Sequence, residues 1–395
     1  MRRILIGILM TVMFITACSE QNVSTTEKVP GVTDTSIKVG AWLPLTGPIA
    51  GHGITQRIGM NAYFKMINEK GGINNRKIEW IVEDNSYDPQ KSVSIARKLV
   101  ERDNVFAIAG SNGTAQNAAT FPYFDKVNTP FMPGLGNAPE WWNPVKPYLF
   151  GVQVLYENQS RALGRWAAKE GAKNILVVHS DPAYFENQAK NVEPGVASFD
   201  ANAKVEFMPV KFGTTDYAPI ALQIQNSKPD AIVIIQSVDE LVALAKALER
   251  QSVKIPLYTY APNVSNDTLD LGSKAVEGLR AMSFTVPPTA DIPEVEEYRN
   301  ALKKYEPDAR PDYQSLFTWA EAKVFAEALK QVKGPLTREN FIKSLESMKN
   351  YETGILPPVT FSPDNHYGVI DLQPVMIEKG EWILKGDFID PTKDW

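Results

Sequence analysis

The sequence predicts an α/β protein built from two Rossmann-like lobes, each with a parallel sheet. Three observations predict this class. Short β-branched apolar runs alternate with segments of helical periodicity over most of the 395 residues. Some runs, such as Ala231–Ile235, are apolar throughout, as expected of strands buried on both faces. The chain also carries more strand–helix units than one sheet accommodates, so we expect two sheets and two lobes.

The elements follow in order from Ile37–Leu43, a β-branched and apolar run that predicts the first strand. Apolar residues at helical spacing then predict a helix over 54–68. Asp88 and Pro89 mark the next helix start, because Asp accepts free backbone N–H groups and Pro has none to satisfy. Further strands are expected at 77–82, 105–109, 174–178, 231–235, 256–259, 358–361, 370–377 and 381–385. Further helices are expected at 186–199, 240–250, 294–305, 314–332 and 338–348.

The N-terminus has the composition of a secretory signal. Arg2 and Arg3 precede an apolar run from Ile4 to Ile15. This run is shorter than the roughly 20 residues that a membrane-spanning helix needs. No later stretch is long and apolar enough to span a membrane either. We therefore expect a signal peptide at 1–17.

The tetrapeptide Ile15-Thr16-Ala17-Cys18 resembles a bacterial lipobox, with Ile15 where Leu is usual. This resemblance implies cleavage before Cys18 and lipid attachment at that residue. Residues 18–35 are mostly polar and cannot bury enough apolar surface to order themselves, so we expect a lipidated flexible tether. The protein would then be exported and lipid-anchored to a bacterial membrane, in the periplasm or at the cell surface. The alternative is an ordinary signal followed by an incidental thiol.

The composition excludes several kinds of site. Cys18 is the only cysteine, so disulfides within the chain are excluded, as are thiolate sites once that thiol is lipidated. The three histidines, His52, His179 and His366, are too scattered for a zinc site, and we expect no metal and no other cofactor. The formal net charge is −5 and no basic stripe is present, so nucleic acid is not an expected partner.

From Ile37 onward the chain resembles the periplasmic solute-binding proteins that serve branched-chain amino acid ABC transporters. The shared motifs include IKVGAWLPLTGP from residue 37, INEKGGI from residue 67, Asp88-Pro89, Ala138-Pro139-Glu140 and PVTF from residue 358. The resemblance implies a type I periplasmic binding protein, whose two lobes are joined by a three-strand hinge around a ligand cleft. We assign lobe I to 36–152 and 284–362, and lobe II to 153–283 and 363–395.

The first candidate site is the loop after the strand at 105–109. Ligands of open parallel sheets sit beyond the carboxyl ends of the strands. Here the sequence GSNGT leads into a helical stretch, and the free N–H groups of a helix start favour a carboxylate or another electron-rich oxygen. The family resemblance implies that this loop binds the ligand carboxylate, although a simple helix cap has the same chemistry. The candidates are Ser111, Asn112, Gly113 and Thr114.

Other candidates rest on matched family positions. In lobe I, Gly136 and Asn137 match a segment that lends hydrogen bonds to the same ligand group. His52 stands where an aromatic residue commonly covers the ligand side chain, and Gln314 matches a position near that side chain. In lobe II we expect contacts after two strands. These candidates are Tyr184, Gln236 and Ser237. Each candidate has a solvated loop or turn residue as its alternative.

One departure concerns the ligand. Pro262 stands where amino acid binders of this family carry an acid that holds the ligand ammonium. A buried ammonium without a negative partner costs several kcal/mol. Asp267 and Asp239 are the alternative sources of that charge. The ligand class therefore stays open between an amino acid, a small carboxylate, including an aromatic acid, and an amide.

These observations predict the substrate-binding component of an ABC importer, which captures a small polar organic solute and delivers it to a membrane permease. The other candidate is a binding protein that signals ligand closure to a membrane receptor. We expect no enzyme and assign no catalytic residue, because nucleophile elbow, P-loop and dinucleotide motifs are missing from the sequence. We expect a monomer that works with a small-molecule ligand, the permease subunits and its lipid anchor.

Overall fold

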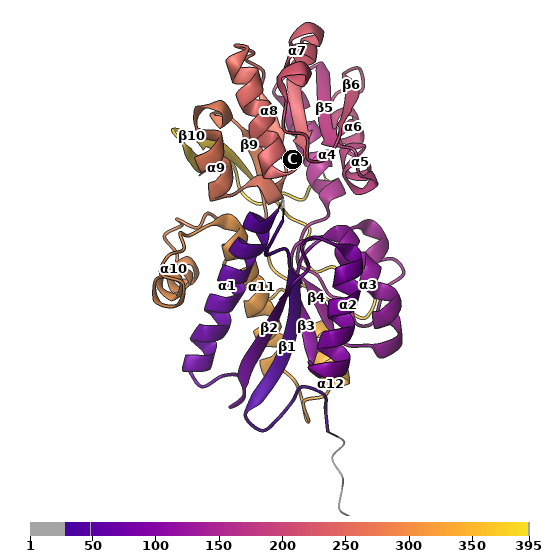
Figure 1. Cartoon of the computed structure of the whole chain (residues 1–395), viewed down its shortest axis with the longest axis vertical. Coiled ribbons are helices and arrows are strands. Elements are labelled where there is room, and N and C mark those ends of the chain that lie inside the picture. Colours follow the sequence, from indigo (N-terminus) through magenta and orange to yellow (C-terminus); the bar gives the residue numbers. More distant parts are fainter. Residues whose placement is uncertain (1–27, 48, 394–395) are drawn as a thin grey trace, which may run out of the picture.

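The computed structural model describes residues 28–47 and 49–393 (Figure 1). The predicted signal peptide at 1–17 and the predicted lipidation residue Cys18 lie outside the described residues. Figure 1 shows two lobes stacked along the long axis of the molecule. Each lobe is built on one sheet flanked by helices, so the predicted two-lobed α/β fold is confirmed.

The sheet of lobe I is parallel, in the order β2-β1-β3-β4. Its strands are β1 (Ser36–Leu43), β2 (Lys77–Asp84), β3 (Ala107–Ser111) and β4 (Phe131–Pro133). Its helices are α1 (Ala50–Glu69), α2 (Pro89–Arg97), α3 (Thr114–Val127), α10 (Pro293–Tyr305), α11 (Tyr313–Lys330) and α12 (Arg338–Glu346). Asp88 accepts the Lys91 N–H at the start of α2, as its position before Pro89 predicts. β1 is almost wholly buried, because helices cover both faces of the sheet.

The sheet of lobe II has the order β11-β10-β9-β8-β7-β5-β6. Its strands are β5 (Asn174–Ser180), β6 (Lys204–Val210), β7 (Ala231–Ile235), β8 (Leu257–Thr259), β9 (Arg280–Ser283), β10 (Gln373–Glu378) and β11 (Glu381–Leu384). Its helices are α4 (Tyr156–Lys169), α5 (Ala183–Ala189), α6 (Val192–Ala197), α7 (Ala218–Ser227), α8 (Val238–Arg250) and α9 (Asn266–Gly272). β5 to β9 pair in parallel, whereas β10 is antiparallel to both β9 and β11. Every residue of β7 is buried, as its apolar sequence predicts.

The chain passes between the two sheets three times, after β4, after β9 and after α12. These passages correspond to the three hinge segments that the family resemblance implies. The lobe boundaries at residues 152, 283 and 362 stay predictions. None of the described helices is both long and apolar enough to cross a bilayer.

Two predicted elements differ from the observed ones. The helix expected at 186–199 is divided into α5 and α6. Pro194 explains this division, because it lacks an N–H and its ring would clash with the carbonyl four residues earlier. The strand expected at 358–361 is reduced to one bridge between Val359 and Tyr351. Pro357 and Pro358 have no N–H to donate there, so a longer ladder cannot form.

The described end of the predicted tether packs against lobe I. The Lys38 N–H donates to the Gly31 carbonyl at 2.8 Å, and Val32 forms a bridge with Ile37. Val29 and Val32 also pack on the hydrophobic core. The prediction of a flexible tether is therefore wrong for residues 28–35, because these valines supply apolar surface within a mostly polar segment.

Candidate functional site

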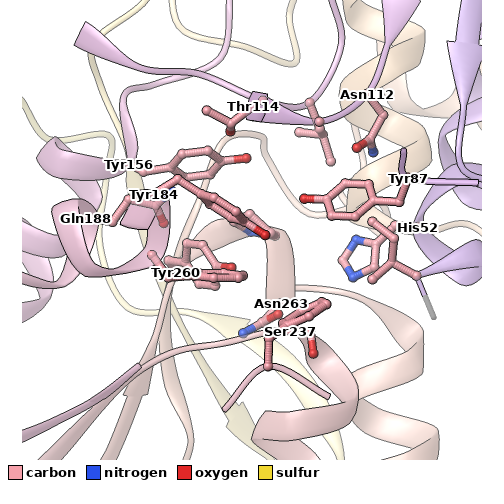
Figure 2. Close-up of a pocket in the computed structure, with 17 residues that line it drawn as sticks. His52, Tyr87, Asn112, Thr114, Tyr156, Tyr184, Gln188, Ser237, Tyr260 and Asn263 are labelled. Carbon is pink, nitrogen blue, oxygen red and sulfur yellow. The ribbon is translucent and has the colours of Figure 1, made fainter. Parts of the chain in front are cut away.

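A cavity of about 60 Å³ lies between the two lobes (Figure 2). It forms where loops at the carboxyl ends of lobe I strands meet the corresponding loops of lobe II, which is the usual ligand position in open α/β sheets. The residues that line it are Ile49, His52, Tyr87, Asn112, Gly113, Thr114, Leu135, Gly136, Tyr156, Tyr184, Phe185, Gln188, Phe212, Ser237, Tyr260, Pro262 and Asn263.

One wall is the turn from β3 into α3. The Gly113 N–H donates to the Leu135 carbonyl at 2.7 Å. Gly113 has a φ of +109°, and a Cβ there would lie 2.2 Å from Gln116 Oε1, so only glycine fits this turn. α3 begins at Thr114 without a side-chain cap. Its free N–H groups and the positive end of its dipole therefore lie at the cavity, where they favour an electron-rich oxygen.

A second glycine extends this wall. Gly136 has a φ of +125°, and its Cβ position lies 2.7 Å from the Gly113 carbonyl carbon and 2.8 Å from the Thr114 nitrogen. A side chain at Gly136 would therefore collide with the first loop. The Gly136 N–H donates to Gln153 Oε1 at 2.7 Å, which fixes this turn to the first passage between the lobes. The two loops thus make one continuous polar surface.

Four tyrosines surround the rest of the cavity. Tyr87 follows β2, Tyr156 begins α4, Tyr184 lies in α5 and Tyr260 follows β8. Figure 2 shows the hydroxyl ends of Tyr87 and Tyr184 pointing toward one another. The Tyr156 and Tyr260 rings lie 5.7 Å apart between centroids. Burial raises the pKa of each of these phenols, so all four are neutral groups that can both donate and accept hydrogen bonds.

His52 lies in the first turn of α1, opposite two acids of lobe II. Burial lowers the pKa of His52, while the nearby charges of Asp267 and Asp239 oppose that shift. The Asp267 carboxylate lies close to the residue before His52: a Cβ added at Gly51 would lie 2.9 Å from Asp267 Oδ2. Both acids are nevertheless exposed, and neither lines the cavity. Among the residues that the structure describes, no Asp, Glu, Lys or Arg lines the cavity.

The structure brings seven of the predicted site residues to the cavity. They are His52, Asn112, Gly113, Thr114, Gly136, Tyr184 and Ser237. Ser237 also caps α8: its hydroxyl donates to Glu240 Oε2 at 2.9 Å in the capping box of that helix. Ligand contact by these seven residues stays a prediction.

The other four predicted residues lie behind the wall, beginning with Ser111 and Asn137 in lobe I. Ser111 is fully buried at the end of β3. Asn137 Nδ2 donates to the Gln153 carbonyl at 2.6 Å, and Asn137 Oδ1 accepts from Trp142 Nε1 at 2.7 Å. The Asn137 side chain is therefore occupied in fixing the loop rather than lining the cavity.

Gln236 and Gln314 are also occupied within the protein. Gln236 Nε2 donates to the Tyr217 hydroxyl at 2.9 Å. Gln314 Nε2 donates to the Ala261 carbonyl at 2.9 Å. The prediction that these two side chains line the cavity is therefore wrong. Each one instead makes a hydrogen bond to a buried group of the protein.

Seven polar or aromatic lining residues were not predicted from the sequence: Tyr87, Tyr156, Phe185, Gln188, Phe212, Tyr260 and Asn263. Tyr87 and Tyr260 come soon after predicted strands, so the strand-end rule was a usable signal for both. Tyr156 begins a helix that was not predicted, and Gln188 lies in a helix expected to begin at 186, whereas α5 begins at Ala183. In the described ranges, 28–47 and 49–393, no three His, Cys, Asp or Glu side chains are placed to hold a metal ion.

Comparisons with known proteins agree on one family. The profile of a family described as periplasmic binding protein matches residues 36–381. A leucine-, isoleucine-, valine-, threonine- and alanine-binding protein of Pseudomonas aeruginosa is 28% identical over 194 residues, which cover 49% of this chain and 51% of that protein. The chain thus aligns with about half the length of the first curated relatives that it matches.

Solved structures share the fold. A branched-chain amino acid ABC transporter protein from Thermus thermophilus with bound valine has a TM-score of 0.82 at 16% identity, covering 91% of this chain and 97% of that one. A solute-binding protein of an ABC transporter from Rhodopseudomonas palustris, in complex with 3,4-dihydroxybenzoic acid, has a TM-score of 0.78 at 22% identity, covering 91% and 98%.

Proposed function

The chain belongs to the periplasmic binding protein family, and on that premise we propose that it captures a small organic solute between its lobes and delivers it to the permease of an ABC importer. The family consists of solute-binding proteins, so the expectation of a binding protein rather than an enzyme is confirmed at the level of the family.

The observation that carries the proposal is that both lobes build the cavity wall. Asn112 and Thr114 come from lobe I, whereas Tyr184, Ser237 and Tyr260 come from lobe II. A solute in contact with both sets gains its full interaction energy only when the lobes are closed. Ligand binding therefore favours closure, and the closed form is what a permease distinguishes from the free protein.

The chemistry of the wall favours a carboxylate or an amide. The start of α3, with the side chains of Asn112 and Thr114, offers N–H and O–H donors to an electron-rich oxygen. Opposite it, neutral aromatic rings suit an apolar or aromatic body. Pro262 lies in the wall where an acid would be needed, so the ammonium of an α-amino acid lacks a charged partner. We rank a small carboxylate, including an aromatic acid, and an amide above leucine, isoleucine and valine.

The relatives span this range of ligands. The Thermus thermophilus structure holds valine, and the Rhodopseudomonas palustris structure holds an aromatic acid. The family fold is therefore compatible with either class, and the ranking for this chain rests on its own cavity residues. We further propose export, with a lipid on Cys18 that keeps the protein beside its permease.

Two measurements on the purified protein test this function. Mass spectrometry of a co-purified small molecule identifies the ligand, and small-angle X-ray scattering compares the protein with and without it. We expect one ligand per chain and a smaller radius of gyration in the bound form. Binding at saturation without any change in the radius of gyration would contradict capture by closure.

A further inference from the structure

The loop at 261–266 supplies part of the cavity wall and is held by both lobes. It follows β8 and leads into α9, so it belongs to lobe II. Pro262 and Asn263 line the cavity. The position of this loop therefore sets the shape of the wall where the acid of amino acid binders is missing.

Several hydrogen bonds within lobe II hold the loop. The Ala261 N–H donates to Gln159 Oε1 of α4 at 3.0 Å. Asn263 Nδ2 donates to Thr259 Oγ1 at 2.8 Å. Near the other end of the loop, Trp382 Nε1 donates to the Ser265 carbonyl at 3.2 Å. These contacts stay within one lobe, so opening the cleft leaves them intact.

Lobe I holds the same loop through Gln314, in the first turn of α11. Gln314 Nε2 lies 2.9 Å from the Ala261 carbonyl and 3.2 Å from the Pro262 carbonyl. Gln314 as a whole is 2% exposed. The backbone of Ala261 is thus hydrogen-bonded to both lobes. Its N–H donates to Gln159 of lobe II, and its carbonyl accepts from Gln314 of lobe I.

Asp312 adds a charged contact beside Gln314. Asp312 Oδ2 accepts the Asn266 N–H at 2.6 Å, and Oδ1 accepts the Gln314 N–H at 2.7 Å. Asn266 Nδ2 also donates to the Pro311 carbonyl at 3.0 Å. Asp312 is buried. Hydrogen bonds from backbone N–H groups are what make such a buried carboxyl tolerable, and separation of the lobes would remove one of them.

We propose that residues 312–314 form an interlobe latch, which holds the 261–266 loop in its ligand-receiving position when the lobes close. Gln314 and Asp312 are then positioning residues that act through Pro262 and Asn263, rather than ligand contacts. The effect on ligand affinity rests on the proposed function, whereas the effect on closure is a property of the free protein.

We expect closure of the latch to depend on pH as well. Burial raises the pKa of Asp312 to about 6, and the negative charge of Asp267 in α9 adds to this shift. The Tyr298 hydroxyl of α10 accepts the Asp312 backbone N–H, and the Tyr313 phenol and the Arg310 guanidinium lie near enough to interact electrostatically with the carboxyl group. Opening would expose Asp312 and return its pKa toward the ordinary value near 3.9. The closed form then binds the proton more tightly, so closure becomes more favourable as the pH falls from about 6 to about 4.

Two latch variants test the inference: Gln314→Leu, and Asp312→Leu, which removes both acceptors of the Asp312 carboxylate. The control is Gln331→Leu. Gln331 is an exposed residue just beyond the end of the same helix. Small-angle scattering of the free proteins should show a larger radius of gyration for both latch variants and no change for the control. Each latch variant should lower the affinity for every ligand about 3- to 30-fold, because each loses one or two hydrogen bonds that involve no ligand atom. The ranking of ligands by affinity should stay the same.

The outcomes separate the latch from the function. Wild-type radius and affinity in both latch variants would overturn the latch, and a changed ligand order for Gln314→Leu would show a ligand contact instead. A larger radius without any detectable ligand would support the latch while the proposed function fails. If either variant does not fold, Asn266→Ala removes only the contact to the Pro311 carbonyl and should show the same change in smaller measure. Affinity that rises as the pH falls from 6 to 4 in the wild type, but not in Asp312→Leu, is the expected proton effect. The same rise in both would assign the proton to another group.

Discussion

Replacement of Thr114 by valine tests the anchoring role of the α3 start. Thr114 is the first residue of α3 and lines the cavity half-buried. Within the described part of the chain its hydroxyl makes no hydrogen bond, so it is free to bind a ligand. Valine keeps the branched shape and removes only the donor. A hydrogen bond to a charged group contributes about 1.5–3 kcal/mol, so Thr114→Val should weaken a carboxylate ligand about 10- to 150-fold.

Isothermal titration calorimetry with the identified ligand measures this loss. The matched control is Thr35→Val, at an exposed threonine that precedes β1 and does not line the interlobe cavity. Both variants should unfold within about 0.5 kcal/mol of the wild type, because neither hydroxyl is part of an internal network. Equal affinity in Thr114→Val, Thr35→Val and the wild type would refute the assignment of the ligand oxygen to this helix start.

Two further variants test other parts of the account. Cys18→Ala should release the protein from the membrane fraction while leaving it folded, as fractionation with immunoblotting would show; retention in that fraction would rule out the lipid anchor. Gly136→Ala should lower the free energy of unfolding by more than 1 kcal/mol and weaken binding, because the new Cβ would meet the backbone of Gly113 and Thr114 and the φ is positive. Wild-type stability and affinity in this variant would show that the two loops do not define the site.

Elements of the fold were predicted correctly from the sequence where one local pattern was clear, such as an apolar run or a helix-capping residue. The apolar run Ala231–Ile235 is β7 without a shift, and Asp88 caps α2 as its position before Pro89 predicts. β6 was missed because it is an edge strand whose residues are largely exposed, so its side chains follow no simple apolar pattern. Edge position alone does not decide the outcome, because the edge strands β2 and β11 were predicted whereas the buried interior strand β9 was not.

Some of the site residues could be predicted from local sequence patterns, and others could not. The turn at Gly113 and Thr114 was predictable, because a strand end followed by a helix start is a local pattern. Whether Gln236 and Gln314 face the cavity depends on partners far along the chain, including the Tyr217 hydroxyl and the Ala261 carbonyl. Both glutamines lie close to the cavity, yet their side chains satisfy buried groups. The orientation of these two side chains follows from tertiary contacts, which a local sequence pattern does not predict.

The central claim is that the cavity takes a small carboxylate or amide rather than a branched-chain amino acid. A thermal-shift panel of leucine, isoleucine, valine, short-chain acids, aromatic acids and amides tests it most directly. A ligand at 100 times its dissociation constant adds about 2.7 kcal/mol of stability, which is readily detected as a higher Tm. We predict the largest shift from an acid or an amide and little shift from leucine. The largest shift from leucine, with none from the acids and amides, would contradict it and direct attention to Asp267 and Asp239 as sources of the missing negative charge.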